Sequence, residues 1–286
     1  MKQIQLYAIM AGGPRELAVD AGEVASVHNL FDDLPVGVYT SLRTFEHNKF
    51  LHLADHLNRL EQSMALLGWD YKLDRTRLRH ALQQVCDAYP GTNARVRIDI
   101  LSQATGGPEV RSRELIGLFP FSPIPDELYE FGVRVAISRQ LSRENPKAKL
   151  AEFAQRRRPF LADAPDAYET LMLDQDGYVL EGTTSNFYAV KDGILWTAAE
   201  GVLEGVTRKI VLQMAQELAI PICLKPVHVD EIGQLDECAL SSSSRAIVPI
   251  VDIAGQTVAD GRPGPLTGRL LVAYKAYVAS AIAPAI

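Results

Sequence analysis

Cysteine is scarce in this sequence. Three cysteines, at positions 86, 223 and 238, are scattered over 286 residues. Their number and spacing exclude the disulfide framework of a small secreted domain and indicate a reducing compartment. The six histidines show no metal-ligand spacing either, because the pair His52 and His56 has no third ligand at a suitable position. We therefore expect a cytoplasmic protein without a metal site.

Long runs of one kind of residue are also absent. The net charge is −6 and the densest basic run is Arg156–Arg158, which we expect to be a solvated helix face. Nucleic acid is therefore not an expected partner, since binding to its backbone needs clustered lysine and arginine. No apolar run reaches eighteen residues, so we expect no membrane span. The first residues also lack the apolar core of a signal peptide.

The remaining composition is that of an ordinary globular protein, with 47% apolar and 22% charged residues. The length allows one large or two medium domains. A stretch near residues 120–131 carries three prolines and several acidic residues, which is typical of a linker. We expect a smaller N-terminal domain over residues 1–120, a linker over 121–131 and a C-terminal domain over 132–286.

Alternating and helical patterns mark the elements of the first half. Residues 36–45 and 94–102 alternate as strands do, and in the second of these Arg97 and Asp99 share a face that either lines a charged pocket or is solvated. Residues 55–67 have the apolar spacing of a helix, for which Asp55 is a suitable N-cap. A second helix is expected over 75–89.

The stretch from Leu171 to Arg208 organises the second half. Its two Asp-Gly pairs, at 176–177 and 192–193, lie between short β-rich runs and predict a three-stranded meander. Glu181 ends the second strand and is followed by Gly-Thr-Thr-Ser-Asn. A carboxylate among small polar residues is costly to bury in a sheet unless something binds there. The segment is therefore either a binding site or a solvated loop.

Two further segments could hold a phosphate. Gly205-Val206-Thr207 opens an amphipathic helix whose first N–H groups point outward, and Ser242-Ser243 lies in a four-serine loop between two strands. Arg59 could add a charge-assisted contact. With the amine of Lys147 or Lys149 and the carboxylate of Glu181, these residues supply what pyridoxal phosphate chemistry requires.

The order of these segments resembles the class IV, fold-type IV aminotransferase family, which includes branched-chain and D-amino-acid aminotransferases and aminodeoxychorismate lyase. The resemblance covers nearly the whole chain. His56-Leu57-Asn58-Arg59-Leu60 is similar to the family's His-x-x-Arg-Leu motif, Leu203-Glu-Gly-Val-Thr-Arg to its phosphate-loop signature, and Leu240-Ser-Ser-Ser-Ser-Arg-Ala-Ile-Val-Pro to its second phosphate loop. The most specific match is Leu173-Asp-Gln-Asp-Gly-Tyr-Val-Leu-Glu-Gly-Thr-Thr-Ser-Asn-Phe.

The resemblance implies a two-domain α/β (α+β) fold with a β-barrel-like core in the larger C-terminal domain, and pyridoxal 5'-phosphate as cofactor. It implies that Glu181 pairs with the pyridine nitrogen and that Arg59 holds the phosphate. It also implies small-molecule amino and 2-oxo acid substrates and a homodimer. The implied cofactor-binding residues are Arg59, Lys149, Glu181, Ser185, Asn186, Leu203, Gly205, Val206, Thr207, Ser242 and Ser243, and the implied substrate-binding residues are Tyr39, Arg43, Arg97 and Ser244.

The lysine that forms the Schiff base lies some thirty residues before the glutamate in this family. Lys147 and Lys149 both qualify. We choose Lys149, because Phe153 fits the aromatic position of the family's Lys-x-x-Asn motif, although Glu152 replaces the asparagine. An aminotransferase is the expected function; a lyase with the same lysine and a silent cofactor-binding protein are the alternatives. The strand over 94–102 matches neither the branched-chain nor the D-amino-acid subgroup.

Overall fold

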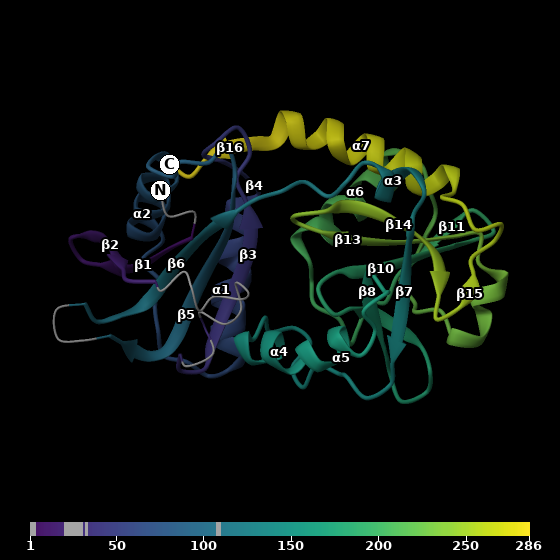
Figure 1. The fold of residues 1–286 in the computed structure, drawn as a ribbon, viewed down its shortest axis with the longest axis horizontal. Helices are drawn as coiled ribbons and strands as arrows, with labels where there is room; N and C mark the ends of the chain where they lie inside the picture. Colours follow the sequence, from purple (N-terminus) through teal and green to yellow (C-terminus); the bar gives the residue numbers. More distant parts are fainter. Residues whose placement is uncertain (1–3, 20–30, 32–33, 107–109) are drawn as a thin grey trace. The chain divides into compact units, whose positions relative to one another are not determined.

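The computed structural model describes residues 4–19, 31, 34–106 and 110–286. They form two compact units, shown in Figure 1. The first unit consists of residues 1–122, 148–156 and 281–286, and the second of residues 123–147 and 157–280. The expected division into 1–120, 121–131 and 132–286 remains a proposal about domain boundaries.

The first unit is built on a five-stranded antiparallel sheet with strand order β2-β1-β6-β5-β3. The alternation of residues 94–102 is confirmed, since Val96, Ile98 and Ile100 are fully buried on one face. Arg97 and Asp99 on the other face are 3% and 1% exposed, which excludes the solvated interpretation. The strands are β1 (Gln5–Met10), β2 (Gly13–Leu17), β3 (Gly37–Arg43), β5 (Ala94–Thr105) and β6 (Ser112–Pro120).

Two helices, α1 (Leu53–Leu66) and α2 (Arg75–Asp87), pack on this sheet and complete its core. The apolar stripe of α1 is buried as its spacing predicts. The predicted N-cap, Asp55, is wrong: the cap residue is His52 in a left-handed conformation, and Asp55 lies in the first turn. A second small sheet pairs β4 (Lys49–Leu51) with β16 (Ile282–Pro284), and α4 (Ala151–Arg156) also belongs to this unit.

The second unit contains a closed barrel. Six strands pair in the ring β10-β13-β14-β7-β8-β9 and back to β10, which confirms the β-barrel-like core. Valine, leucine and isoleucine side chains from these strands fill it. The ring is formed by β7 (Val133–Ser138), β8 (Glu169–Leu173), β9 (Val179–Gly182), β10 (Asn186–Lys191), β13 (Glu237–Ser242) and β14 (Ala246–Ile253).

The predicted meander is β8, β9 and β10. The second Asp-Gly turn joins β10 to β11 (Ile194–Trp196) in a hairpin, and Asp192 and Gly193 both have positive φ there. The helices are α3 (Glu127–Glu130), α5 (Arg158–Ala162), α6 (Val206–Glu217) and α7 (Pro265–Ala281), with a 3₁₀ helix over Val229–Gln234. The short strands are β11 (Ile194–Trp196), β12 (Ile222–Cys223) and β15 (Gln256–Thr257).

A single long helix after Lys149 would have to pass through Pro159. The chain instead forms α4 and α5, because Pro159 has no N–H to bond within a continuous helix and stands in the first turn of α5. Among the described residues, none of the helices combines the length and apolar character that crossing a membrane requires.

Candidate active site

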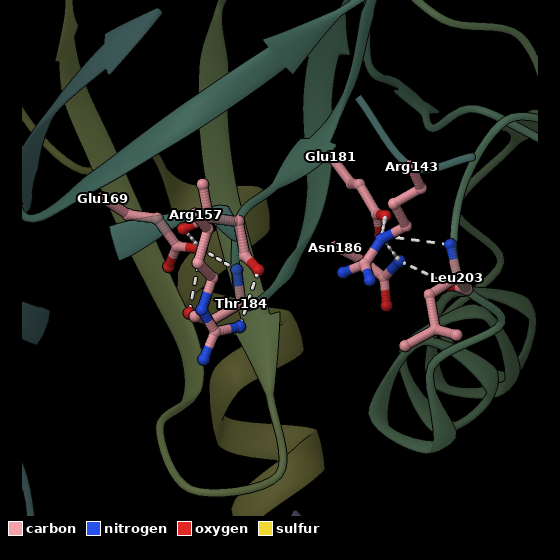
Figure 2. A network of polar contacts seen from close by, with 8 residues as sticks. Arg143, Arg157, Glu169, Glu181, Thr184, Asn186 and Leu203 are labelled. Atoms are coloured by element: carbon pink, nitrogen blue, oxygen red, sulfur yellow. Dashed lines mark hydrogen bonds and ion pairs between the residues drawn. The ribbon is translucent and has the colours of Figure 1, made fainter. Parts of the chain in front are cut away.

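Glu181 is the second-last residue of β9 and is 2% exposed. Its Oε1 accepts a hydrogen bond from Nε of Arg143 at 2.6 Å, and its Oε2 accepts from Nδ2 of Asn186 and from the backbone N–H of Leu203, each at 3.2 Å (Figure 2). These donors offset the cost of burying a carboxylate. Glu181 is therefore a buried, charge-paired acid, and the solvated-loop interpretation does not hold.

The loop of residues 182–185 continues from Glu181 and is fixed by Glu169. The hydroxyl of Thr184 donates to Oε1 of Glu169 at 2.9 Å, and the backbone N–H of Thr184 donates to the same oxygen (Figure 2). A Cβ at Gly182 would lie 2.6 Å from that oxygen and 2.5 Å from Oγ of Ser185. The match to Gly-Thr-Thr-Ser thus describes a tightly packed turn in which only glycine fits at 182.

Arg157 holds the same loop from its other side. Its Nη1 donates to the carbonyl of Thr183 at 3.0 Å, and the side chain is buried (Figure 2). We expected the run Arg156–Arg158 to be a solvated helix face, and for Arg157 this prediction is wrong. The residue lies where α4 ends and α5 begins, so the break at Pro159 turns it inward instead of leaving it on a continuous outer face.

The start of α6 has features suited to an anion. Gly205 is its N-cap and has no side chain with which to cap the first N–H groups of the helix. A Cβ at Gly205 would lie 2.1 Å from Oδ1 of Asn186, whose Nδ2 donates to the carbonyl of Leu203 at 2.8 Å. A helix N-terminus of this kind favours a phosphate.

Hydroxyl groups from a second loop lie beside the start of α6. Oγ1 of Thr207 in α6 is 3.5 Å from Oγ of Ser243, which lies in the turn between β13 and β14. Ser242 and Ser244 flank Ser243 and are half-buried. The two loops that the sequence proposed as a phosphate site therefore meet within the second unit. Val206 stands with Thr207 in the first turn of α6.

Lys149 belongs to the first unit and is held there by its backbone. Its N–H donates to Oγ of Ser63 at 3.1 Å, and its carbonyl accepts from the N–H of Tyr39 at 3.0 Å. Its Nζ lies 4.8 Å from the centre of the Tyr39 ring. Lys147, the alternative, is an exposed residue. The segment around Lys149 is thus attached to both β3 and α1, whereas the side chain of Lys147 faces solvent.

Arg59 lies in α1, one turn before Ser63, and is 7% exposed. Its Nη2 donates to Oγ1 of Thr40 at 2.9 Å, and the same hydroxyl lies 2.7 Å from Nδ1 of His56. Burial, together with the nearby charges of Arg59 and Lys149, holds the pKa of His56 well below its usual value. The neutral imidazole and the hydroxyl therefore orient Arg59 without adding positive charge.

The residues expected to contact substrate also lie in the first unit, apart from Ser244. Arg97 pairs with Asp99 through two hydrogen bonds of 2.8 and 2.7 Å, and its guanidinium lies 4.3 Å from the centre of the Tyr39 ring. The guanidinium of Arg43 lies 3.9 and 4.2 Å from the ring centres of Phe45 and Phe121. A substrate carboxylate would have to compete with Asp99 for Arg97.

Four residues of these networks were not identified from the sequence. Arg143 contacts Glu181, Ser63 contacts Lys149, and Arg245 and Glu169 form an ion pair of 2.8 Å. The partner of each is distant in the sequence, and no local pattern links the two residues of a contact. Only Ser63 has a local hint, since it stands one helical turn after Arg59.

The chain was compared with known proteins. Residues 37–253 match the family model described as amino-transferase class IV. The chain belongs to the class IV aminotransferase family. It is a pyridoxal-phosphate-dependent aminotransferase with a fold-type IV architecture, and its substrates are amino and 2-oxo acids. The fold and family expected from the motifs are confirmed.

Related aminotransferases match over most of their length. A probable branched-chain-amino-acid aminotransferase of Thermotoga maritima is 30% identical over 90% of this chain and 92% of its own. A D-alanine aminotransferase of Bacillus licheniformis is 29% identical over 84% and 86%. A solved branched-chain aminotransferase from the archaeon Thermoproteus uzoniensis, with norvaline, has a TM-score of 0.77 at 22% identity and covers 99% of both chains.

The polar groups present in this class IV aminotransferase fit its cofactor. The buried hydroxyl oxygen of Ser185 has no hydrogen-bond partner among the described residues, although buried hydroxyl groups usually have one. The start of α6 suits a dianionic phosphate, and the carboxylate of Glu181 suits a ring N–H. The residues that would hold the cofactor in the second unit are therefore Glu181, the Gly205–Thr207 turn and Ser243.

Proposed function

We propose that Lys149 is the lysine that carries pyridoxal phosphate in this aminotransferase and that moves the proton at the substrate Cα. The observation that supports this is its double attachment, with Ser63 bonded to its N–H and Tyr39 to its carbonyl. These two hydrogen bonds fix the backbone from which the lysine side chain extends. Proton transfer by a side chain requires such positioning. The exposed Lys147 has no comparable role in this proposal.

Each of the other residues has a binding or orienting role. When bound, pyridoxal phosphate supplies an electron sink for the charge that develops at the substrate Cα. Arg143 and Asn186 orient the carboxylate of Glu181, which accepts a hydrogen bond from the protonated ring nitrogen of the cofactor. Thr207, Ser243 and the N–H groups at the start of α6 bind the phosphate, and Arg59 adds a charged contact to it.

We further propose an uncharged aliphatic amino acid as amino donor. The relatives act, by their names, on branched-chain amino acids or D-alanine, which share an uncharged aliphatic side chain. In this chain the Arg97–Asp99 pair offers no net charge to an acidic side chain, which agrees with such a donor. A panel of L-leucine, L-valine, D-alanine and L-glutamate tests this. A marked preference for L-glutamate as donor would contradict it.

Transamination itself is tested in two half-reactions. The purified protein should be yellow, and the amino donor alone should convert its visible absorption band. Addition of a 2-oxo acid should then restore the band, with product formation dependent on that acid. Repeated turnover without any 2-oxo acid would favour the lyase alternative. A protein that gains no visible band with added pyridoxal phosphate would refute the proposed cofactor site.

The homodimer and the cytoplasmic location complete the proposal. Sedimentation of the purified protein should give at least a dimer. A monomer that keeps full activity would contradict the proposed assembly. All three cysteines are free in the structure, which agrees with a reducing compartment.

A further inference from the structure

Arg245 uses each of its three side-chain nitrogens on a different partner. Nε donates to Oγ of Ser242 at 2.9 Å, Nη1 donates to Oε2 of Glu169 at 2.8 Å, and Nη2 donates to the hydroxyl of Thr184. These partners lie at the end of β13, at the start of β8 and in the loop after Glu181, respectively. A planar guanidinium can connect three such directions at once, which a lysine ammonium on a flexible stem does poorly.

The buried carboxylate of Glu169 completes this connection. Its Oε2 accepts from Arg245, and its Oε1 accepts from the backbone N–H and the hydroxyl of Thr184 and, at 3.3 Å, from the hydroxyl of Thr183. Burial alone would raise the pKa of Glu169. The charge of Arg245 and the hydrogen bonds of Thr184 outweigh burial and leave that pKa below its usual value. The pair is therefore charged at neutral pH.

The two segments that this pair connects contact opposite ends of the cofactor in the proposed function. The loop of residues 182–185 directly follows Glu181, the contact of the ring nitrogen. The turn of residues 242–245 carries Ser243, a contact of the phosphate. The distance between ring nitrogen and phosphate is fixed by the cofactor's covalent structure. A rigid link between the two contacts would therefore hold the site ready for both ends.

We propose that Arg245, with Glu169, is a positioning residue that couples the ring-nitrogen contact to the phosphate contact of the cofactor. The inference rests on the proposed function of Glu181 and Ser243. A purely structural ion pair would stabilise the fold without distinguishing between ligands. A positioning role predicts a specific loss of the affinity that the phosphate group confers.

The test compares the affinity of the full-length apoenzyme for pyridoxal phosphate with its affinity for pyridoxal, which lacks the phosphate. Both are measured by the visible absorption of the bound ligand. The variants are Arg245→Met and Arg245→Lys, and Ser242→Ala removes the acceptor of the Nε hydrogen bond. Arg134→Met is the matched control, because Arg134 forms a 3.9 Å ion pair with Asp252 in the same unit while 71% exposed.

We expect Arg245→Met to weaken pyridoxal phosphate binding by about 10- to 100-fold, the range for hydrogen bonds to charged groups. Pyridoxal binding should change less than about threefold, and Arg134→Met should change neither. Arg245→Lys and Ser242→Ala should show smaller losses in the same direction. They keep the test decisive if Arg245→Met does not fold. Combined with Ser243→Ala, the loss from Arg245→Met should be less than additive, because both changes act on one contact.

Equal weakening of both ligands, or a lower melting temperature with unchanged affinities, would overturn the positioning role alone. A different result would show that the proposed phosphate site itself is wrong. In that case the wild-type apoenzyme would bind pyridoxal as tightly as pyridoxal phosphate, and Ser243→Ala would have no effect on either. That result would overturn the proposed site and this inference together.

Discussion

Nε of Arg143 lies 2.6 Å from Oε1 of Glu181, and the two side chains are 6% and 2% exposed. A charge-assisted hydrogen bond at this distance orients the carboxylate and stabilises its charged form. Glu181 also accepts from Asn186 and from the N–H of Leu203, so three segments of the second unit fix one carboxylate. Both carboxylate oxygens of Glu181 thus accept hydrogen bonds.

The first prediction concerns this ion pair. Breaking a buried pair by removing one partner costs about 3–5 kcal/mol of stability, because the other charge stays buried. Arg143→Met should therefore lower the melting temperature and also reduce kcat, since the carboxylate loses its orientation. Glu181→Gln should reduce kcat by about 100-fold or more through loss of the charged contact.

The partly exposed pair of Lys191 and Glu231 provides the control. Lys191→Met should change stability by less than about 1 kcal/mol and leave kcat unaltered. Thermal melts and steady-state kinetics measure both effects. Wild-type kcat in Glu181→Gln would remove this residue from the mechanism.

The second prediction is steric. Gly205 has a φ of −69°, which any residue can adopt, yet a Cβ there would lie 2.1 Å from Oδ1 of Asn186. Gly205→Ala should displace the Asn186 amide, and with it the hydrogen bonds to Glu181 and to the carbonyl of Leu203. Overpacking of this kind costs about 1–3 kcal/mol. We expect weaker retention of the cofactor during dialysis.

Gly233→Ala is the matched control, because a Cβ built there would meet nothing within 4 Å in the described part of the chain, its own chain neighbours aside. It should retain the cofactor like the wild type. If Gly205→Ala also does so, the close approach of Gly205 to Asn186 has no part in cofactor binding.

The third prediction concerns pH and His56. The folded protein keeps this buried imidazole neutral, because burial and the charges of Arg59, Lys149 and His52 lower its pKa well below 6.5. The unfolded chain protonates the same group near its ordinary value of about 6.5. Below that pH the unfolded state binds the extra proton, so the free energy of unfolding falls as pH drops from about 6.5 toward the folded pKa.

His56→Asn should remove this contribution. In urea denaturation at pH 7.5 and 5.5, the wild type should lose about 1 kcal/mol more than the variant between the two conditions. Other titrating groups affect both proteins alike and cancel in the comparison. An identical loss in wild type and variant would show that His56 titrates normally in the folded protein.

Local patterns in the sequence predicted the elements and their faces. The alternation along β5 placed Val96 and Ile98 in the core, and the two Asp-Gly pairs located the turns of the meander. These features depend on neighbours a few residues away, where periodicity and turn chemistry act. The Asp55 cap failed for a similarly local reason, because His52 adopts the left-handed conformation and begins the helix earlier.

The contacts that organise the candidate site were not predictable in this way. Arg143 and Glu181 are 38 residues apart, Ser63 and Lys149 are 86 apart, and Glu169 and Arg245 are 76 apart. Each contact exists because strands and helices bring distant segments together, and no short-range pattern encodes it. The family motifs located Glu181 and Lys149 together with Asn186, Leu203 and Tyr39, but not Arg143 and Ser63, which also contact them.

The most direct test of the account asks which lysine binds the cofactor. Borohydride reduces the bond between cofactor and lysine to a stable amine, and peptide mapping by mass spectrometry then locates the label. The account predicts a label on Lys149, with Lys149→Ala losing the visible band and about 10²- to 10⁴-fold or more of the activity, while Lys147→Ala keeps both. A label on Lys147, with Lys149→Ala still yellow and active, would contradict it.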